Sequence, residues 1–436
     1  MEIKINVFLF HSNSYAKHII RSTRAVTKRD SRVTLWKPLT IRELKLFLSI
    51  VFNMGLIRKS SIEEYWNSTM ASQASNWFKR TISRNRFQNI LRFLYVSDHS
   101  KNFPRDHPGY DPASRFRPLL NFMNRQFGRF LVPEKEICVD ETLVASKGHN
   151  IMRQYIPSKA GKFGIKFWML CESATGYILQ MTVYRGRNFD PVPSGELQGT
   201  QVVTSLLSSA NLLNKCYHVF CDRTLRKNRP MPNVIKSADP APNNAVYMRK
   251  GKVLCMAYRD ADGKRPVRML STYLPAQELR SGKPKIVHVY NKNMGGVDTT
   301  DSVMKAYSGQ RKNRKTWKKV LLHLYHRILH NAYILYTKNT ADTPIKSRVR
   351  FIQDVVESLS DTVTINVIPA RARPHDQRRN IHVGVKLLSG RKEKDCCVCS
   401  RRSQAGGRRR SRTACSFCGK GLHRCCIQFH YNCHEY

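Results

Sequence analysis

The spacing of apolar residues changes along the chain and predicts a helical part followed by a mixed α/β part. Residues 36–97 carry apolar side chains three and four positions apart, which is the period of an amphipathic helix. Thr40 and Glu43 precede the first such run with the spacing of a capping box. Residues 98–116 are polar and proline-bearing, and we expect them to form a connector.

From residue 134 the pattern becomes that of strands. We expect strands and one helix in the order β-β-β-α-β, with the helix over 202–213 and the strands over 136–144, 165–171, 177–184 and 217–221. This order predicts an α/β fold whose sheet has antiparallel and parallel parts, the arrangement of ribonuclease-H-like nucleases and integrases. Short strands near 254–258 and 267–270, and helices over 298–306 and 316–337, complete the pattern.

The charge of the chain restricts the class of partner. The sequence has 76 Lys and Arg residues against 30 Asp and Glu, a formal net charge of +46. Self-repulsion of this size costs stability unless a polyanion is bound, so we expect a nucleic acid. An acidic membrane surface is the weaker alternative. No apolar run reaches the ~18 residues of a membrane-spanning helix, and without a secretory pattern at Met1 we expect an intracellular protein with no membrane partner.

Three aspartates from distant parts of the sequence suggest phosphodiester chemistry. Asp140 and Asp222 each end an apolar run that we expect to be a strand, and Asp298 begins an expected helix. Carboxylates at neighbouring strand ends can hold two divalent ions, which activate a nucleophile and stabilise the leaving oxygen. Taken singly, each aspartate is better explained as a turn or helix-cap residue than as a metal ligand.

The C-terminal region has the spacing of a zinc module. Eight of the 13 cysteines lie between residues 396 and 433 and are mixed with histidines. They form four ligand pairs, which are Cys396/Cys399, Cys415/Cys418, His423/Cys426 and His430/Cys433. Four such pairs make two tetrahedral Zn²⁺ sites, and so small a segment needs metal to fold. Pairing the first with the third and the second with the fourth gives a cross-brace, while sequential pairing is the alternative.

Several short motifs, in order, resemble the piggyBac-type transposase family. They are Tyr65-Trp66, Asn85–Phe87, Val139–Glu141, Arg153–Lys159, Lys162–Lys166, Cys221-Asp222, Leu225–Arg229 and Tyr290–Asp301, followed by the cysteine spacing of the tail. Together they cover about residues 35–436. Their order carries the resemblance, and no single motif is sufficient.

This resemblance implies a ribonuclease-H-like transposase that cuts and rejoins DNA at TTAA. Asp140, Asp222 and Asp298 would bind Mg²⁺ or Mn²⁺, and Asp301 would be an auxiliary catalytic carboxylate. The resemblance also implies a homodimer on double-stranded DNA at the transposon terminal repeats, in the nucleus. The expected DNA-binding residues are Lys159, Lys162, Lys166, Arg311, Lys312, Arg314 and Lys315.

The resemblance and the composition divide the chain into five segments. We expect an atypical leader, a helical dimerisation and DNA-binding region, a catalytic domain with an insertion over 230–290, a basic linker and a cysteine-rich zinc-binding domain. Their bounds are 1–34, 35–130, 131–340, 341–390 and 391–436.

One departure from the family concerns the segment that follows Asp222. The family has a further helix there, whereas here Asp222 runs directly into Leu225–Arg229. Loss of that helix would weaken the support of the metal site. Two alternatives to an active transposase therefore remain. One is a domesticated, non-catalytic chromatin or DNA-binding protein, and the other is an adaptor whose zinc module binds proteins.

Overall fold

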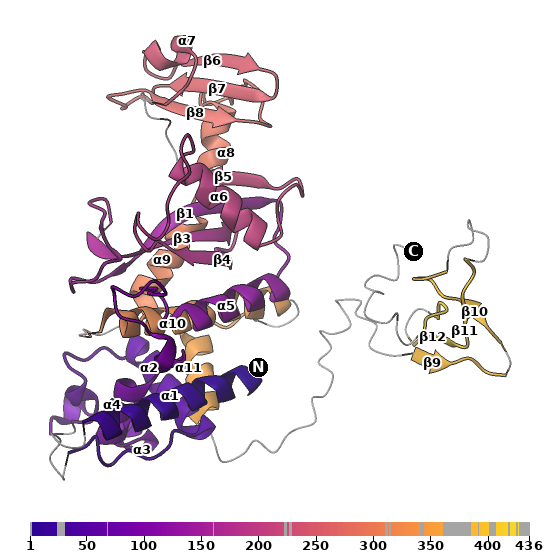
Figure 1. Ribbon diagram of the computed structural model, residues 1–436. Helices are drawn as coiled ribbons and strands as arrows, with labels where there is room; N and C mark the ends of the chain where they lie inside the picture. Colours follow the sequence, from indigo (N-terminus) through magenta and orange to yellow (C-terminus); the bar gives the residue numbers. More distant parts are fainter. Residues whose placement is uncertain are drawn as a thin grey trace. The chain divides into compact units, whose positions relative to one another are not determined.

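The computed structural model divides the chain into two compact units, Met1–Thr362 and Val363–Tyr436 (Figure 1). The five-segment division made from the sequence is finer and stays a prediction. The structure describes residues 2–23, 31–67, 69–159, 161–221, 225, 229–309, 313, 315–340, 344–360, 385–390, 392–400, 407–416, 419–423 and 426.

The first part of the larger unit is helical. Its helices are α1 (Glu2–Ser22), α2 (Ile41–Leu56), α3 (Asn76–Thr81) and α4 (Arg84–Phe93). The apolar spacing predicted helices within residues 36–97, whereas the first helix lies in the segment 1–34, where none was predicted. The predicted capping box is confirmed, because Thr40 and Glu43 exchange hydrogen bonds at the start of α2. Arg86 of α4 lies 2.7 Å from Glu43 and also donates to the Lys37 carbonyl oxygen, so this arginine joins α4 to the start of α2.

A mixed sheet forms the centre of the larger unit. Its strands are β1 (Glu136–Ala145), β2 (Arg153–Tyr155), β3 (Phe163–Glu172), β4 (Ile178–Val183) and β5 (His218–Cys221). The order is β2-β3-β1-β5, and β4 also pairs with β3. β1 runs antiparallel to β3 and parallel to β5, which confirms the predicted mixture of strand directions. The buried side chains of β1 and β3 belong to one continuous hydrophobic core.

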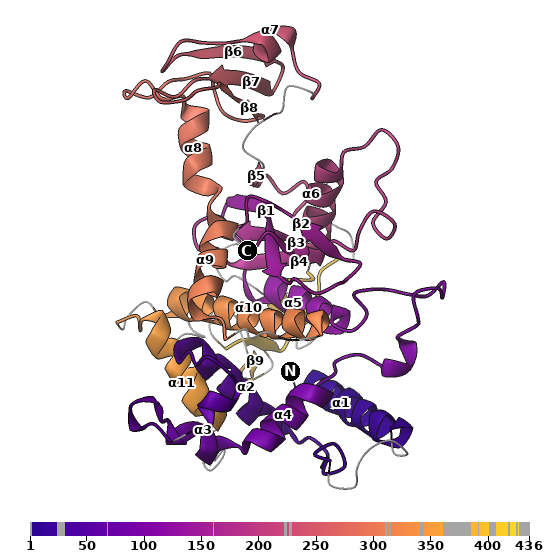
Figure 2. The ribbon, with the colours of Figure 1, turned by 90° about the vertical axis from the view of Figure 1, so that its left-hand side faces the viewer.

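Helices pack on the sheet from both sides. They are α5 (Arg117–Phe130), α6 (Gln198–Ser209), α9 (Gly296–Tyr307) and α10 (Thr316–Asn339). A further helix, α11 (Arg348–Ser360), packs on α2 and α10. Figure 2 shows α6 and α9 on opposite sides of the sheet. Asn124 of α5 and Asn331 of α10 each exchange two hydrogen bonds with the backbone of β4. These bonds satisfy polar groups of an edge strand and fix both helices against it.

The segment between β5 and α9 forms a small substructure of its own. It comprises α7 (Asn233–Ser237), β6 (Ala245–Lys250), β7 (Val253–Tyr258), β8 (Val267–Ser271) and α8 (Lys285–Asn293). The three strands form an antiparallel sheet in the order β6-β7-β8, and the strands expected near 254–258 and 267–270 are thus confirmed. Met256, Met269 and Ile286 belong to a separate small core.

The smaller unit is built from short strand pairs. β10 (Lys394–Asp395) pairs with β11 (Arg410–Ser411), and β12 (Thr413–Cys415) pairs with β9 (Val385–Leu387). Its described hydrophobic cluster consists largely of cysteines, with Leu422 among them. Such a core is too small to fold by burial alone, which agrees with the predicted need for metal.

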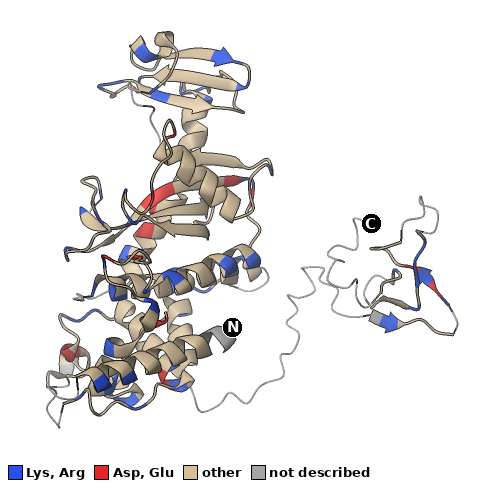
Figure 3. Ribbon diagram, in the orientation of Figure 1, with Lys and Arg blue, Asp and Glu red and all other residues tan. Residues whose placement is uncertain are grey.

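Charge is distributed unevenly over the ribbon. Figure 3 shows Lys and Arg on most elements, whereas acidic positions occur on β1 and on α9 near the middle of the larger unit. Within the described ranges, no helix is both long enough and apolar enough to cross a membrane. β1 and α9 thus each contribute acidic residues to the middle of the larger unit.

Candidate functional site

Asp140 lies in the middle of β1, and the expectation that it ends its strand is wrong. The strand continues to Ala145 because residues 141–145 keep pairing with β3, up to Ala145 opposite Gly164. Asp140 itself pairs with Met169. A mid-strand position fixes the backbone of this aspartate on both sides, whereas a strand end would leave it half in a turn.

A glycine brings Asp298 to the same sheet. α9 begins at Gly296, where an added Cβ would lie 2.7 Å from Cys138 Sγ and 3.0 Å from the Glu172 carbonyl oxygen. Only a residue without a side chain lets the helix start lie directly on β1 and β3. Asp298 then falls in the first turn of α9, as predicted. Sequence analysis assigned no role to Gly296, although its place two residues before Asp298 was a usable signal.

The carboxyl group of Asp140 has a raised pKa. Burial raises the pKa of this carboxyl to about 6, and the negative charges of Glu141 and Asp298 act in the same direction. The backbone N–H of Glu141, which donates to Asp140 Oδ1 at 2.7 Å, and the charge of Lys159 oppose the rise. The fold therefore holds a carboxylate where ionisation is costly and where a bound cation would remove the cost.

The described lysines of the predicted DNA-binding set lie near these carboxylates. Lys159 Nζ is 3.7 Å from Asp298 Oδ1, and the Asp298 side chain is 74% exposed. Lys166 Nζ is 3.1 Å from Glu141 and 3.5 Å from the centre of the Trp168 ring. Lys162 is exposed in the turn between β2 and β3. Two of these three lysines thus neutralise acidic groups around Asp140.

Asp301 has a different environment from Asp140. Arg327 of α10 is fully buried and donates from Nη2 to Asp301 Oδ1 at 2.6 Å. The Thr142 hydroxyl of β1 donates to the same oxygen at 2.7 Å. Arg327 also donates from Nε to His323 at 3.0 Å. Asp301 is therefore neutralised within a network that joins α9, α10 and β1, and sequence analysis missed Arg327 because it lies within an apolar helical face.

A pocket of about 450 Å³ opens beside these residues. Asp298, Asp301 and Lys159 line it, together with the end of β1 and residues of α9 and α10. Because the wall contains exposed carboxylate and ammonium groups, the pocket suits a charged, hydrated ligand better than an apolar one.

Part of the predicted site lies outside the described residues. This applies to Asp222 and to Arg311, Lys312 and Arg314, while Lys315 is described at the start of α10. β5 ends at Cys221, which is the neighbour of Asp222 in the sequence and pairs with Val139, the neighbour of Asp140.

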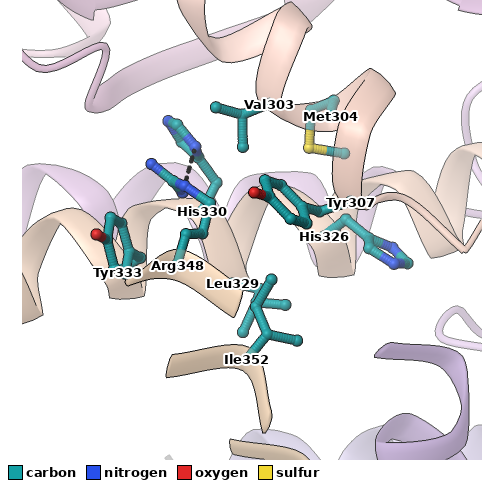
Figure 4. Close-up of a pocket in the computed structure, with 9 residues that line it drawn as sticks. All are labelled: Val303, Met304, Tyr307, His326, Leu329, His330, Tyr333, Arg348 and Ile352. Carbon is teal, nitrogen blue, oxygen red and sulfur yellow. Dashed lines mark hydrogen bonds between the residues drawn. The ribbon is translucent and has the colours of Figure 1, made fainter. Parts of the chain in front are cut away.

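A second cavity, between α9, α10 and α11, has the properties of core packing (Figure 4). Its volume is only about 20 Å³. Arg348 donates to Nδ1 of His330 at 3.3 Å, and the Gly176 carbonyl oxygen lies 3.1 Å from Nε2 of the same ring. Burial and the charge of Arg348 lower the pKa of His330 to about 3, so this histidine is neutral and satisfied. The cavity contributes packing between helices.

In the smaller unit, four predicted ligands converge. The ligand atoms of Cys396, Cys399, His423 and Cys426 all lie within 4.8 Å of one another. His423 Nε2 lies 2.8 Å from the Arg410 carbonyl oxygen, which leaves Nδ1 facing Cys399 Sγ at 3.3 Å. This cluster can hold a metal ion, and it joins the first ligand pair to the third.

The thiol chemistry of this cluster fits a metal. Burial raises the pKa of Cys396, but hydrogen bonds from the backbone of His423, Cys399 and Val398 outweigh it and lower the pKa to about 6. A thiolate is the form that binds metal. Cys415 is buried but is not one of the four converging ligands. The rest of the second predicted ligand set lies outside the described residues, namely Cys418, His430 and Cys433.

Comparison with known proteins shows which family the chain matches. A model described as Transposase IS4 matches residues 8–226 and 221–333. Human PiggyBac transposable element-derived protein 3 is 25% identical, covering 90% of this chain and 70% of its own length. Human PiggyBac transposable element-derived protein 5 is 22% identical, covering 80% and 74%.

A solved structure shares the fold. The cryo-EM structure of a piggyBac transposase synaptic complex with hairpin DNA matches with a TM-score of 0.71 at 21% identity, covering 97% of this chain and 94% of that one. The chain belongs to the Transposase IS4 family, and within it to the piggyBac-type transposases.

Proposed function

We propose that the larger unit carries a ribonuclease-H-like site for metal-dependent cleavage and strand transfer of double-stranded DNA. The observation that carries the proposal is that Asp140 of β1 and Asp298 of the first turn of α9 are close enough to interact electrostatically, and that Asp298 lines a charged pocket. The parallel pairing of β5 with β1 supports Asp222 as the third acid, since Cys221 pairs with Val139.

The donor set suits Mg²⁺ or Mn²⁺. Carboxylate oxygens are the preferred ligands of these ions, and a bound cation would favour the ionised form of Asp140, whose pKa burial raises to about 6. When bound, the ions would supply charge stabilisation at the reacting phosphate. The residues of this chain supply the rest. Asp140 and Asp298 hold the ligand positions, and the Arg327–Asp301 pair fixes the orientation of α9.

We further propose that DNA is bound by the basic surface of the larger unit and by the smaller unit with two Zn²⁺ ions. The residues from 391 to 436 include 11 Lys and Arg against 3 Asp and Glu, a net charge of +8 (11 − 3). This charge favours DNA over a basic protein partner. By the same reasoning from the family, we propose a nuclear homodimer that acts at terminal repeats and TTAA targets.

Nicking of supercoiled plasmid DNA tests the catalytic part. With Mn²⁺ or Mg²⁺ the wild-type chain is expected to convert supercoiled DNA to open circles, and Asp140→Ala and Asp298→Ala to remove this activity. Glu141→Gln serves as the control, because Glu141 is not one of the expected metal ligands and pairs with Lys166. Equal nicking by wild type and both alanine variants would rule out the proposed acids.

A non-catalytic, domesticated DNA-binding protein is the second candidate. The family match consists of two segments that meet at residues 221–226, where the sequence lacks the helix expected after Asp222. Tight, salt-dependent DNA binding without nicking in either metal would favour this candidate. A salt slope near zero would contradict backbone contacts in both cases.

A further inference from the structure

An exposed aromatic pair lies at the turn beside the candidate site. Tyr155 of β2 and Phe163 of β3 pair across the two strands, with ring centres 4.8 Å apart and 37° between the ring planes. Tyr155 is 58% exposed and Phe163 is 38% exposed. Two large rings that face each other usually exclude water, but these two leave much of their surface in solvent.

Stabilisation of the hairpin does not account for the pair. The turn between the strands is already held by backbone bonds, from the Ile156 N–H to the Lys162 carbonyl oxygen at 2.7 Å and from the Lys162 N–H to the Lys159 carbonyl oxygen at 2.9 Å. A cross-strand aromatic pair would add only about 0.2–1 kcal/mol. The exposed rings of Tyr155 and Phe163 are thus available for another purpose.

The register places the pair on the sheet face that carries Asp140. Residues that pair across antiparallel strands share a face, and every second residue of a strand returns to it. Phe163 therefore shares a face with Met169, six residues further along β3, and Met169 pairs with Asp140. The turn also carries Lys159, which lies 3.7 Å from Asp298 and lines the pocket. The turn thus joins the aromatic pair to Lys159, a residue that lines the pocket with Asp298 and Asp301.

Two cationic residues, Arg153 and Lys162, lie next to the Phe163 ring or beside it in the sequence. The guanidinium carbon of Arg153 lies 5.3 Å from the centre of the Phe163 ring, and Arg153 Nη1 donates to the Lys147 carbonyl oxygen at 3.1 Å. Lys162 is exposed next to Phe163, and its backbone has a φ of 45°, held by the turn bonds described above. Aromatic faces among fixed cations form the surface on which proteins stack bases while they contact phosphates.

We propose that Tyr155 and Phe163 form a stacking platform for an unpaired nucleobase of the DNA strand that leads to the carboxylate pocket, with Arg153 and Lys162 at the adjoining phosphates. An unpaired base is required because a base inside a duplex presents only its edges. The direction of the strand rests on the proposed function, but the stacking itself needs neither metal nor catalysis.

The test measures DNA affinity in EDTA with the full-length chain. The probes are a blunt duplex and the same duplex with a four-nucleotide single-stranded extension. Tyr155→Ala and Phe163→Ala are expected to weaken binding of the extended duplex about tenfold, and binding of the blunt duplex less than about twofold. Tyr155→Trp keeps an aromatic face and should retain affinity, which separates lost stacking from misfolding.

Phe103→Ala is the matched control, because Phe103 is also 38% exposed but lies in the connector and stacks on His107. It should change neither affinity. Equal losses for both probes, or no loss for the extended one, would overturn the platform and leave the proposed function standing. Failure of the wild-type chain to bind either DNA would overturn both.

Discussion

Replacing Asp140 with asparagine is expected to stabilise the apo protein at neutral pH. Burial raises the pKa of this carboxyl from 3.8 to about 6, so the folded state binds a proton more tightly than the unfolded state does. The stability of a group with a raised folded pKa is complete below the unfolded value and is lost as the pH rises through the folded value. The cost of ionised Asp140 therefore develops between about pH 4 and pH 6.

The size of the effect follows from the shift. At ~1.4 kcal/mol per unit, a rise from 3.8 to about 6 corresponds to about 3 kcal/mol. An asparagine side chain cannot ionise, so Asp140→Asn should gain up to about 3 kcal/mol at pH 8 and much less at pH 4. The neighbouring Glu141 pairs with Lys166 at 3.1 Å and contributes less to the Asp140 pKa than burial does, so Glu141→Gln should gain far less at pH 8.

Urea unfolding in EDTA at pH 4 and pH 8 provides the measurement. The midpoint difference between Asp140→Asn and wild type should grow with pH, while the slope with urea stays the same. Added Mn²⁺ should stabilise wild type more than the variant. A gain in stability that is equal at both pH values would show that the asparagine acts through packing. It would refute the argument that ionisation of buried Asp140 destabilises the fold.

Three further predictions concern the supports of the two sites. Gly296→Ala forces a Cβ to 2.7 Å from Cys138 Sγ, so we expect urea unfolding to show a loss of stability of about 1–3 kcal/mol. Gly295→Ala is the control and should lose far less stability, because the space around Gly295 is open. Arg327→Met leaves Asp301 without its cation and should lower the free energy of unfolding by about 3 kcal/mol. Adding Asp301→Asn should restore part of this loss, and a double-mutant cycle measures the coupling between the two residues. Cys399→Ser should lower the zinc content of the purified chain by one ion from an expected two, while the exposed Cys216→Ser should not change it.

The sequence predicted the sheet better than it predicted the support of the site. Apolar alternation depends on which face of a strand is buried, and it located the strands that became β1, β3, β4 and β5 to within a few residues. The strand predicted over 136–144 contains Asp140, but the expectation that Asp140 ends it is wrong, because the polar Glu141 and Thr142 that follow look like the end of an apolar run. Their pairing partners lie in β3, and pairing is a tertiary property.

The roles of Gly296 and Arg327 could not be derived from local pattern either. Gly296 is required by the closeness of Cys138, a residue 158 positions earlier in the chain, and Arg327 by the acid that faces it from α9. Zinc spacing is different, because each ligand pair is local. It predicted Cys396, Cys399, His423 and Cys426 as ligands, and the structure brings these four together, first pair with third, as a cluster that could hold a metal ion.

Asp140 and Asp301 differ in how far the surrounding residues neutralise their negative charge. Asp301 receives a fully buried arginine and a threonine hydroxyl, so its charge is satisfied without any ligand. Asp140 receives one backbone N–H and the charge of Lys159, and burial still raises its pKa to about 6. A fold that needed these acids only for stability would gain by compensating both. The uncompensated acid is therefore the one expected to meet a cation, while Asp301 keeps α9, and with it Asp298, in place. It follows that Asp301→Asn should weaken nicking through misplacement of Asp298, and that higher Mn²⁺ concentration should restore part of the lost activity, as it cannot for Asp140→Ala.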